Sequence, residues 1–185
     1  MYSQINSIQA SLWIFNLPFC VPTEGYQKDV VVNNVSMSLK NPKNDSGRYH
    51  FMTFGGAAGE YLITNLTLSN FHIYKFQNAT VTPLFLSMSI NDYLTLRDFV
   101  VEDMNISRTI ISIEKARQVI LERITFQGFA GFGNRAISSV GALDMQLRDI
   151  RFINYTGSNS LSEPVISMTN AVNSDVSING LVVQN

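Results

Sequence analysis

The stretch that decides the fold is Leu94-Thr95-Leu96-Arg97-Asp98-Phe99-Val100-Val101, because its pattern returns along the chain. Apolar residues stand at its first, third, sixth and eighth positions, and a polar residue stands at the fifth. Other segments follow the same template: Val30–Met37, Leu66–Ile73, Val119–Phe126, Met145–Phe152 and Val176–Val183. Self-similarity of this kind indicates a repeat architecture.

The spacing of the copies can be counted between their fifth positions. It is occupied by Asn34, Asn70, Asp98, Arg123, Asp149 and Gly180, in steps of 36, 28, 25, 26 and 31 residues. Apart from Arg123, these are the residue types that best tolerate a left-handed backbone or bond their own main chain. We therefore predict that two short strands meet at a bend at this position.

A further apolar segment precedes most copies and is predicted to form a third strand in each rung. These segments are Leu84–Ile90, Thr109–Ile113, Ala136–Val140 and Val165–Met168. Parallel strands about 4.8 Å apart would stack each inward residue on its counterpart in the next rung and so form the core. The predicted fold is an all-β, right-handed parallel β-helix with three short strands per rung and about five to seven rungs.

The repeat also sets the predicted domain organisation. Residues 1–29 are expected to be an N-terminal rung or a lead-in of uncertain pairing, and residues 30–185 are expected to be the rungs of the β-helix. The chain ends partway through a rung without a polar cap, so we expect the rungs to continue beyond residue 185.

The alternative to this fold is an antiparallel sandwich. That fold predicts tight hairpin signals between strands, and the single Asn-Gly pair of the chain, Asn179-Gly180, lies inside a repeat copy. Outward charges favour the parallel stack. In consecutive rungs position four carries Arg97, Glu122 and Arg148, and position five carries Asp98, Arg123 and Asp149. Opposite charges would then lie above one another.

The repeat, apolar-x-apolar-x-Asn/Asp-apolar-x-apolar, resembles that of the pectin-lyase-like right-handed β-helix superfamily, which includes pectate lyases, polygalacturonases, phage tailspikes and large surface proteins. The resemblance covers roughly residues 30–185. It implies the fold rather than the chemistry, because enzymes, adhesins and scaffolds share this superfold. The polygalacturonase signatures Asn-Thr-Asp, Asp-Asp, Gly-His-Gly and Arg-Ile-Lys do not occur. We therefore interpret the chain as a non-catalytic repeat segment of a large surface protein.

Candidate residues for catalysis or metal binding are few. The acids Glu102 and Asp103 are neighbours at the end of a strand, where one should face outward and the other should enter a loop. His50 lies in a long insertion between two copies, and His72 takes an outward strand position. The single Cys20 excludes an internal disulfide and a multi-cysteine metal site. We expect no catalytic residue, no cofactor and no metal.

Six Asn-x-Ser/Thr sequons suggest glycosylation, at Asn34, Asn44, Asn65, Asn78, Asn105 and Asn154. The sequons at Asn78, Asn105 and Asn154 fall just after the last strand of their rungs, along one edge of the coil. N-glycans need exposed sites in a secreted chain. We therefore expect an extracellular or cell-surface glycoprotein.

The composition of the chain limits the classes of molecule that it is expected to bind. A net charge of −1 with 15% charged residues offers no basic surface for nucleic acid. The most apolar stretch, Leu12–Val21, is too short for a membrane span and contains Asn16 and Pro18. We expect partners to be other protein chains of an extracellular assembly or glycans, in homo- or hetero-oligomers. Candidate contact residues are the aromatic side chains Tyr74, Tyr93 and Phe132.

The sequence thus predicts a structural or adhesive scaffold segment of a large extracellular, filament-like protein. Two other functions stay open. A polysaccharide lyase or glycoside hydrolase would need a metal-binding acid cluster or paired carboxylates, in rungs partly outside this segment. A non-catalytic carbohydrate-binding solenoid has the same sequence features as the scaffold.

Overall fold

The structure is a computed structural model, and it describes residues 3–5, 8–11, 29–38, 50–54, 65–79, 82–88, 92–106, 109–129, 135–154, 165–169 and 175–184. Every regular element in these residues is a β-strand. The strands are β1 (Ser3–Ile5), β2 (Ile8–Ser11), β3 (Val30–Ser38), β4 (His50–Phe54), β5 (Asn65–Tyr74), β6 (Gln77–Ala79), β7 (Thr82–Ser87), β8 (Tyr93–Ile106), β9 (Ile111–Glu114), β10 (Gln118–Phe129), β11 (Ile137–Val140), β12 (Asp144–Ile153), β13 (Ile166–Thr169) and β14 (Asp175–Gln184).

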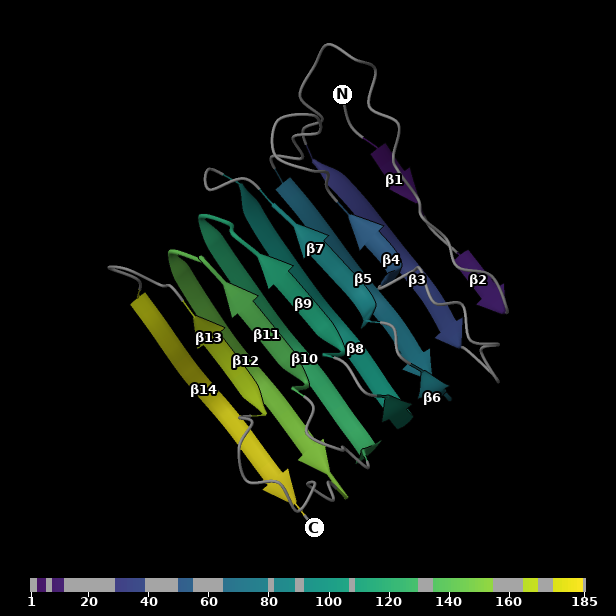
Figure 1. The fold of residues 1–185 in the computed structure, drawn as a ribbon. Coiled ribbons are helices and arrows are strands. Elements are labelled where there is room, and N and C mark those ends of the chain that lie inside the picture. Colours follow the sequence, from purple (N-terminus) through teal and green to yellow (C-terminus); the bar gives the residue numbers. More distant parts are fainter. Residues whose placement is uncertain are drawn as a thin grey trace.

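The described strands form two parallel sheets, and apart from β6, which follows β5 in the same sheet, the chain alternates between them from β3 to β14 (Figure 1). The larger sheet stacks the long strands in the order β1-β3-β5-β8-β10-β12-β14, with β2 also pairing with β3 and β6 with β8. The second sheet stacks the short strands in the order β13-β11-β9-β7-β4. This arrangement confirms the all-β parallel solenoid predicted from the repeat.

The number of turns that have a described neighbour on both sides is slightly smaller than the five to seven rungs expected. Within the second sheet only β7, β9 and β11 have a described strand on both sides. About three turns are therefore enclosed from both directions in both sheets. Within the described part of the chain, the outermost strands are stacked from one side only.

The bend predicted at the fifth template position is present in every described copy. Its residues Asn34, Asn70, Asp98, Arg123, Asp149 and Gly180 all have positive φ, between 53° and 74°. Because the strands keep their parallel register on both sides of this residue, the two predicted short strands are two arms of one long, bent strand. Arg123 adopts the left-handed conformation as well, although its side chain does not favour it.

A second series of bends follows the first by five residues. Lys75, Asp103, Gly128 and Asn154 have φ values of 51° to 61°. Apart from Lys75, these are again the residue types that tolerate a left-handed backbone, but the corner lies outside the eight-residue template and was not predicted. A third corner, at Lys115, Ala116 and Gly141, precedes the return to the long strands.

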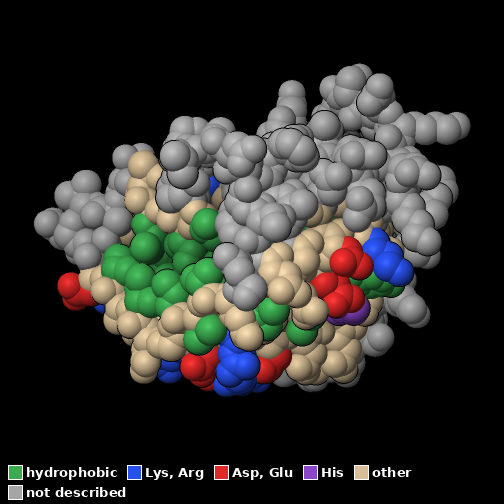
Figure 2. Space-filling model, turned by 90° about the horizontal axis from the view of Figure 1, so that it is seen from below, with side chains coloured by type: hydrophobic (Ala, Val, Ile, Leu, Met, Phe, Trp, Pro, Cys, Tyr) green, Lys and Arg blue, Asp and Glu red, His purple; other side chains and the backbone are tan. Residues whose placement is uncertain are grey.

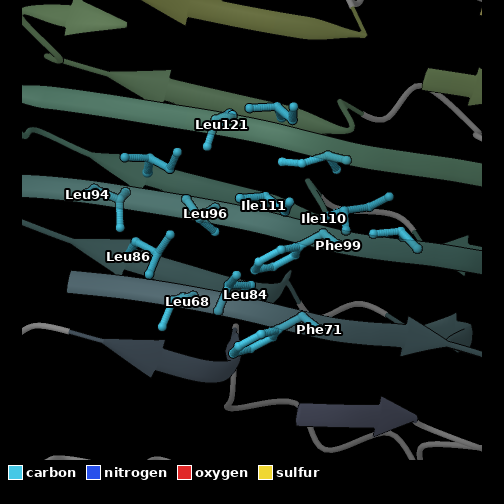
Figure 3. Packing of buried hydrophobic residues seen from close by; sticks show 14 of the residues in the cluster. Leu68, Phe71, Leu84, Leu86, Leu94, Leu96, Phe99, Ile110, Ile111 and Leu121 are labelled. Atoms are coloured by element: carbon cyan, nitrogen blue, oxygen red, sulfur yellow. The ribbon is translucent and has the colours of Figure 1, made fainter. Parts of the chain in front are cut away.

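The core consists of columns of equivalent residues that run along the stack (Figure 3). Leu68, Leu96 and Leu121 occupy the third template position of paired strands and are fully buried. At the sixth position the rings of Phe71 and Phe99 stack with centroids 4.7 Å apart and planes 4° from parallel. Short strands close the core from the other side with residues such as Leu84, Leu86 and Ile111.

The first two strands form a further copy of the template. Ser3–Ile5 pairs with Val30–Val32, and Ile8–Ser11 pairs with Val35–Ser38, in the same parallel register as the later copies. Ser3, Ile5, Ile8 and Ala10 therefore hold the four apolar template positions. The pairing of this segment was not predictable because Ser3 and Ala10 weaken its hydrophobic pattern.

Candidate functional site

Among the described residues, β14 presents a distinctive apolar surface at one end of the stack. The template continues in β14, where Val176, Ile178, Leu181 and Val183 pair in register with core residues of β12. In β12 those partners are at most 3% exposed, whereas the four β14 residues are 43% to 64% exposed. Residues that would form the next layer of the core therefore face outward.

An apolar hollow lies beside these residues. It has a volume of about 210 Å³ and is lined by Phe152, Val165, Ile166, Leu181 and Val183. Figure 2, which views the molecule from below relative to Figure 1, shows a continuous hydrophobic patch on this side. We call the surface formed by β14, the segment Val165–Thr169 and this hollow the open end.

The described strands of the open end are paired on one side. Among the described strands β14 pairs only with β12, and β13 pairs only with β11. A strand inside a parallel sheet bonds both neighbours, whereas one edge of β14 has no partner among the described strands. A further rung of the stack would pair with this edge and cover the exposed column.

The charged groups near the middle of the stack are engaged with one another. Arg123 binds Asp98 of the preceding rung through two hydrogen bonds of 2.6 and 3.0 Å, and it also binds Glu122. Hydrogen bonds from Arg123 hold the pKa of Asp98 below its ordinary value, although burial opposes the shift. The same carboxylate raises the pKa of Arg123.

The strand register confirms the predicted charge ladder, because Glu122 is the partner of Arg97 in β8 and of Arg148 in β12. Asp98 and Arg123 form an ion pair between rungs. The ion pair of Glu122 is with its sequence neighbour Arg123. Arg148 instead donates a hydrogen bond to Gln146 on its own strand.

Uncharged side chains also link successive rungs. The Oδ1 atom of Asn33 accepts hydrogen bonds from Ser69 Oγ at 3.0 Å and from Asn70 Nδ2 at 2.7 Å. Asn65 donates to Asp29 at 2.6 Å in the same region. Gln118 donates to Asp144 at 2.8 Å. These contacts join adjacent long strands and hold the stack in register.

Among the residues considered for catalysis, His72 and Glu102 contact each other, and Asp103 lies apart from this pair. The Nε2 atom of His72 lies 2.8 Å from Oε1 of Glu102, and its ring stacks on Tyr74 with centroids 4.4 Å apart. Asp103 lies at a left-handed bend, with its Oδ1 atom 3.4 Å from where a Cβ on Gly128 would stand. Glu102 thus contacts the preceding rung and Asp103 the following one.

Some of the other candidate residues are described only in part or lie outside the described residues. His50 begins β4, and its side chain lies outside the described structure. Cys20 and Phe132 lie outside the described residues. Of the aromatic contact candidates, Tyr74 is half-buried against His72, whereas Tyr93 is exposed.

The sequons occupy different settings. Asn34, Asn65 and Asn154 are exposed, and Asn34 and Asn154 are themselves bend residues with positive φ. Asn78 and Asn105 belong to the paired strands β6 and β8 rather than to the loops after them. Asn44 lies outside the described residues. Glycosylation of these sites stays a prediction.

The described residues contain no group of three or more His, Cys, Asp or Glu side chains arranged to hold a metal ion. None of the described segments is a helix long and apolar enough to cross a membrane. Comparison of the chain with protein-family models, curated proteins and solved structures finds no match. The structure shows the fold to be a parallel β-solenoid, whereas assignment to the pectin-lyase-like superfamily stays a proposal.

Proposed function

We propose that this chain is a structural and adhesive scaffold segment of an extracellular or cell-surface, filament-like protein, and that it has no catalytic activity. The observation that carries the proposal is the continuity of the core columns from β3 to β12, whose register β14 continues. A stack of this kind lengthens by repetition without needing a new core. Its backbone hydrogen bonds and columns would form a rod that presents binding surfaces along its length.

The polar contacts between rungs support the same function. Asn33, Asn70, Asp98 and Arg123 use their side chains to bind the neighbouring rung. Such side chains are engaged in holding the stack together, which is the role expected of a scaffold. We also propose that the chain belongs to the pectin-lyase-like superfamily, because the bent parallel rungs match the repeat that suggested it.

The enzymatic alternative lacks an equivalent supporting observation. A glycoside hydrolase needs two carboxylates that face one groove, about 5 to 10 Å apart. Glu102 and Asp103 are adjacent, but Glu102 contacts His72 and Asp103 lies beside Gly128. The carbohydrate-binding alternative would rest on exposed Tyr93, a single aromatic residue among those described as large and exposed.

The extracellular part of the proposal is tested by glycopeptide mapping of the natively purified protein. We expect hexose-containing adducts on at least one of Asn78, Asn105 and Asn154. A mass spectrum in which all six sequons carry unmodified asparagine would contradict an extracellular location reached through a glycosylating pathway.

The non-catalytic part is tested by incubating the protein with a panel of polysaccharides that includes polygalacturonate, with and without Ca²⁺. We expect no new reducing ends and no unsaturated products beyond those from heat-unfolded protein. Turnover that disappears in the Glu102→Gln variant but persists in Glu122→Gln would overturn the scaffold proposal and establish the enzymatic one.

A further inference from the structure

We infer that the outer face of β8 and its neighbouring long strands binds a neutral glycan, with the ring of Tyr93 at the centre of the site. This inference rests on the proposed scaffold function, because it names the chemistry that one adhesive surface of the rod would recognise. Three features carry it: the exposure of Tyr93, the fixed amide side chains on either side of it, and the charges around them.

The residues of the site form a row across four successive long strands. Register pairs join Asn65 to Tyr93, Tyr93 to Gln118, and Gln118 to Asp144. Each stands directly before the first template position, where residues such as Leu94 point inward, so the row points outward. At about 4.8 Å per rung, these three steps make the row about 14 Å long. We call these four residues the Tyr93 row.

Tyr93 presents an exposed aromatic ring on a fixed backbone. The residue is 42% exposed, although its strand is paired on both sides. Asp92, directly before it, is buried, and its carbonyl oxygen accepts hydrogen bonds from the backbone N–H groups of Arg117 and Gln118 at 2.7 and 3.4 Å. An aromatic ring held in this way offers an apolar face to the C–H groups of a sugar and loses little conformational entropy on binding.

The amide side chains on either side of Tyr93 are fixed by carboxylates that lie farther from the ring along the stack. Asn65 Nδ2 donates to Asp29 Oδ1 at 2.6 Å, and Gln118 Nε2 donates to Asp144 Oδ2 at 2.8 Å. An amide has two N–H donors and one carbonyl acceptor, so each bond leaves one N–H and the oxygen unused. Oriented donors and acceptors of this kind suit the hydroxyl groups of a sugar.

The charges around the Tyr93 row favour an uncharged ligand. Asp144 closes the row, Asp175 follows it in the next strand, and Asp29 lies beyond the other end. Among the residues that directly flank the row in sequence, Arg117 is the single cation. A uronate-containing or sulfated glycan, or a nucleic acid, would bring negative charge beside several carboxylates, and like charges repel. A neutral glycan avoids this repulsion.

A peptide fits this surface less well than a glycan does. An extended peptide that binds to a sheet adds to an unpaired strand edge. The strand β5 pairs with β3 and β8, β8 pairs with β5 and β10, and β10 pairs with β8 and β12, so these strands have no such edge. A glycan needs no edge, because its apolar faces can contact the ring while its hydroxyl groups contact the amides.

A single site of this kind should bind weakly. The Tyr93 row lies on the outer face of a sheet, so a bound glycan would keep one side in water, unlike a ligand enclosed in a pocket. Weak sites suit adhesion when many copies face the same glycan-bearing surface, because simultaneous binding raises the overall affinity.

Isothermal titration calorimetry of the full chain tests the class of ligand. The probes are the neutral glycans cellohexaose and mannohexaose and their charged counterpart hexagalacturonate. We expect at least one neutral glycan to bind and hexagalacturonate to bind more weakly. Absence of binding of both neutral glycans at millimolar concentration, with the protein folded by circular dichroism, would overturn the inference. Tighter binding of hexagalacturonate would overturn it too.

Replacement of Tyr93 tests where the glycan binds. Tyr93→Ala removes the ring, so we expect the affinity for the neutral glycan to fall by about tenfold or more, whereas Tyr93→Phe should stay within about threefold of wild type. Val100→Ala is the matched control, because Val100 is 41% exposed on the outer side of the same strand. Equal affinities of folded Tyr93→Ala and Val100→Ala would place the glycan elsewhere and contradict the inference.

The amides are tested by Gln118→Leu, which keeps the size of the side chain but removes its hydrogen-bonding groups. We expect a loss of affinity of about threefold or more, and no loss in Gln127→Leu, an exposed position of the same strand. A polyproline peptide that binds through Tyr93 while no glycan does would assign the row to a peptide and refute the inference. The scaffold proposal itself would then still be judged by glycopeptide mapping and the turnover experiment.

Discussion

The Oδ1 atom of Asp149 lies 2.5 Å from the position that a Cβ atom on Gly180 would occupy. The two residues hold the fifth template position of adjacent long strands, and Gly180 has a φ of 74°. Backbone atoms of Asp149 stand 3.3 and 3.4 Å from the same point. Gly180 thus satisfies two demands at once: a left-handed bend and close approach of the preceding rung.

Replacing Gly180 tests both demands. We expect Gly180→Ala to lower the free energy of unfolding by about 1–2 kcal/mol from the left-handed backbone alone, with an added loss from displacement of Asp149. Urea denaturation followed by circular dichroism would measure it. In an Asp149→Ala background the side-chain conflict is absent, so the cost of Gly180→Ala should fall but not vanish. An unchanged cost would show that the Asp149 carboxylate plays no part.

Removing the hydroxyl of Ser139 is expected to stabilise the protein. Its Oγ atom is buried without a hydrogen-bond partner, between Ile113 and Met168 in neighbouring short strands. Ser139→Ala removes the unsatisfied group, so we expect the free energy of unfolding to rise by about 1 kcal/mol. The matched control is Ser138→Ala, at the adjacent buried position of the same strand. A Ser139→Ala variant that is less stable than wild type would mean that the hydroxyl is satisfied in solution.

The aromatic column gives a prediction about packing. Phe99 is fully buried and its ring stacks on Phe71, while Val100, the next residue, is 41% exposed. Phe99→Ala should cost about 3–5 kcal/mol, because it removes a large buried side chain. Val100→Ala should cost within about 0.5 kcal/mol. If Phe99→Ala does not fold, Phe99→Leu offers a milder comparison and should still cost clearly more than Val100→Ala.

Much of the fold could be predicted because the sequence of each rung contains two signals. Residues such as Asn70, Asp98 and Asp149 mark the left-handed bend by their type. The apolar residues around them mark the faces of the strands that point inward. The corner at Lys75, Asp103, Gly128 and Asn154 was not predicted because it follows the eight-residue template and so was not part of the repeat comparison. Three of its four residues are Asp, Gly or Asn, so the same signal was present in the sequence.

The open end was harder to predict than the core. Its column residues Val176, Ile178 and Leu181 match the template as well as buried copies do, so sequence alone did not separate exposed from buried rungs. The sequence correctly placed Glu122 between Arg97 and Arg148 in the stack, but it did not reveal the ion pair that Glu122 forms with Arg123, the next residue along the chain.

The ion pair between Arg123 and Asp98 predicts a dependence of stability on pH. Hydrogen bonds from Arg123 lower the pKa of Asp98 in the folded chain relative to the unfolded one. The pair therefore contributes stability above the unfolded pKa of about 4, and this contribution is lost as the pH falls through the lower, folded value. Asp98→Asn should accordingly be less stable than wild type near neutral pH, with the difference shrinking below about pH 4.

A double-mutant cycle isolates this effect from the bend at Asp98, where asparagine is equally tolerated. In an Arg123→Gln background the carboxylate has lost its partner, so adding Asp98→Asn should change the free energy of unfolding by a small amount that varies little with acid. The measurement is urea denaturation of the four proteins at several pH values, at low and at high salt, because exposed pairs are screened. A pH-dependent difference that persists without Arg123 would assign the lowered pKa of Asp98 to another group, and the next one to replace would be Arg97, the second positive charge near this carboxylate.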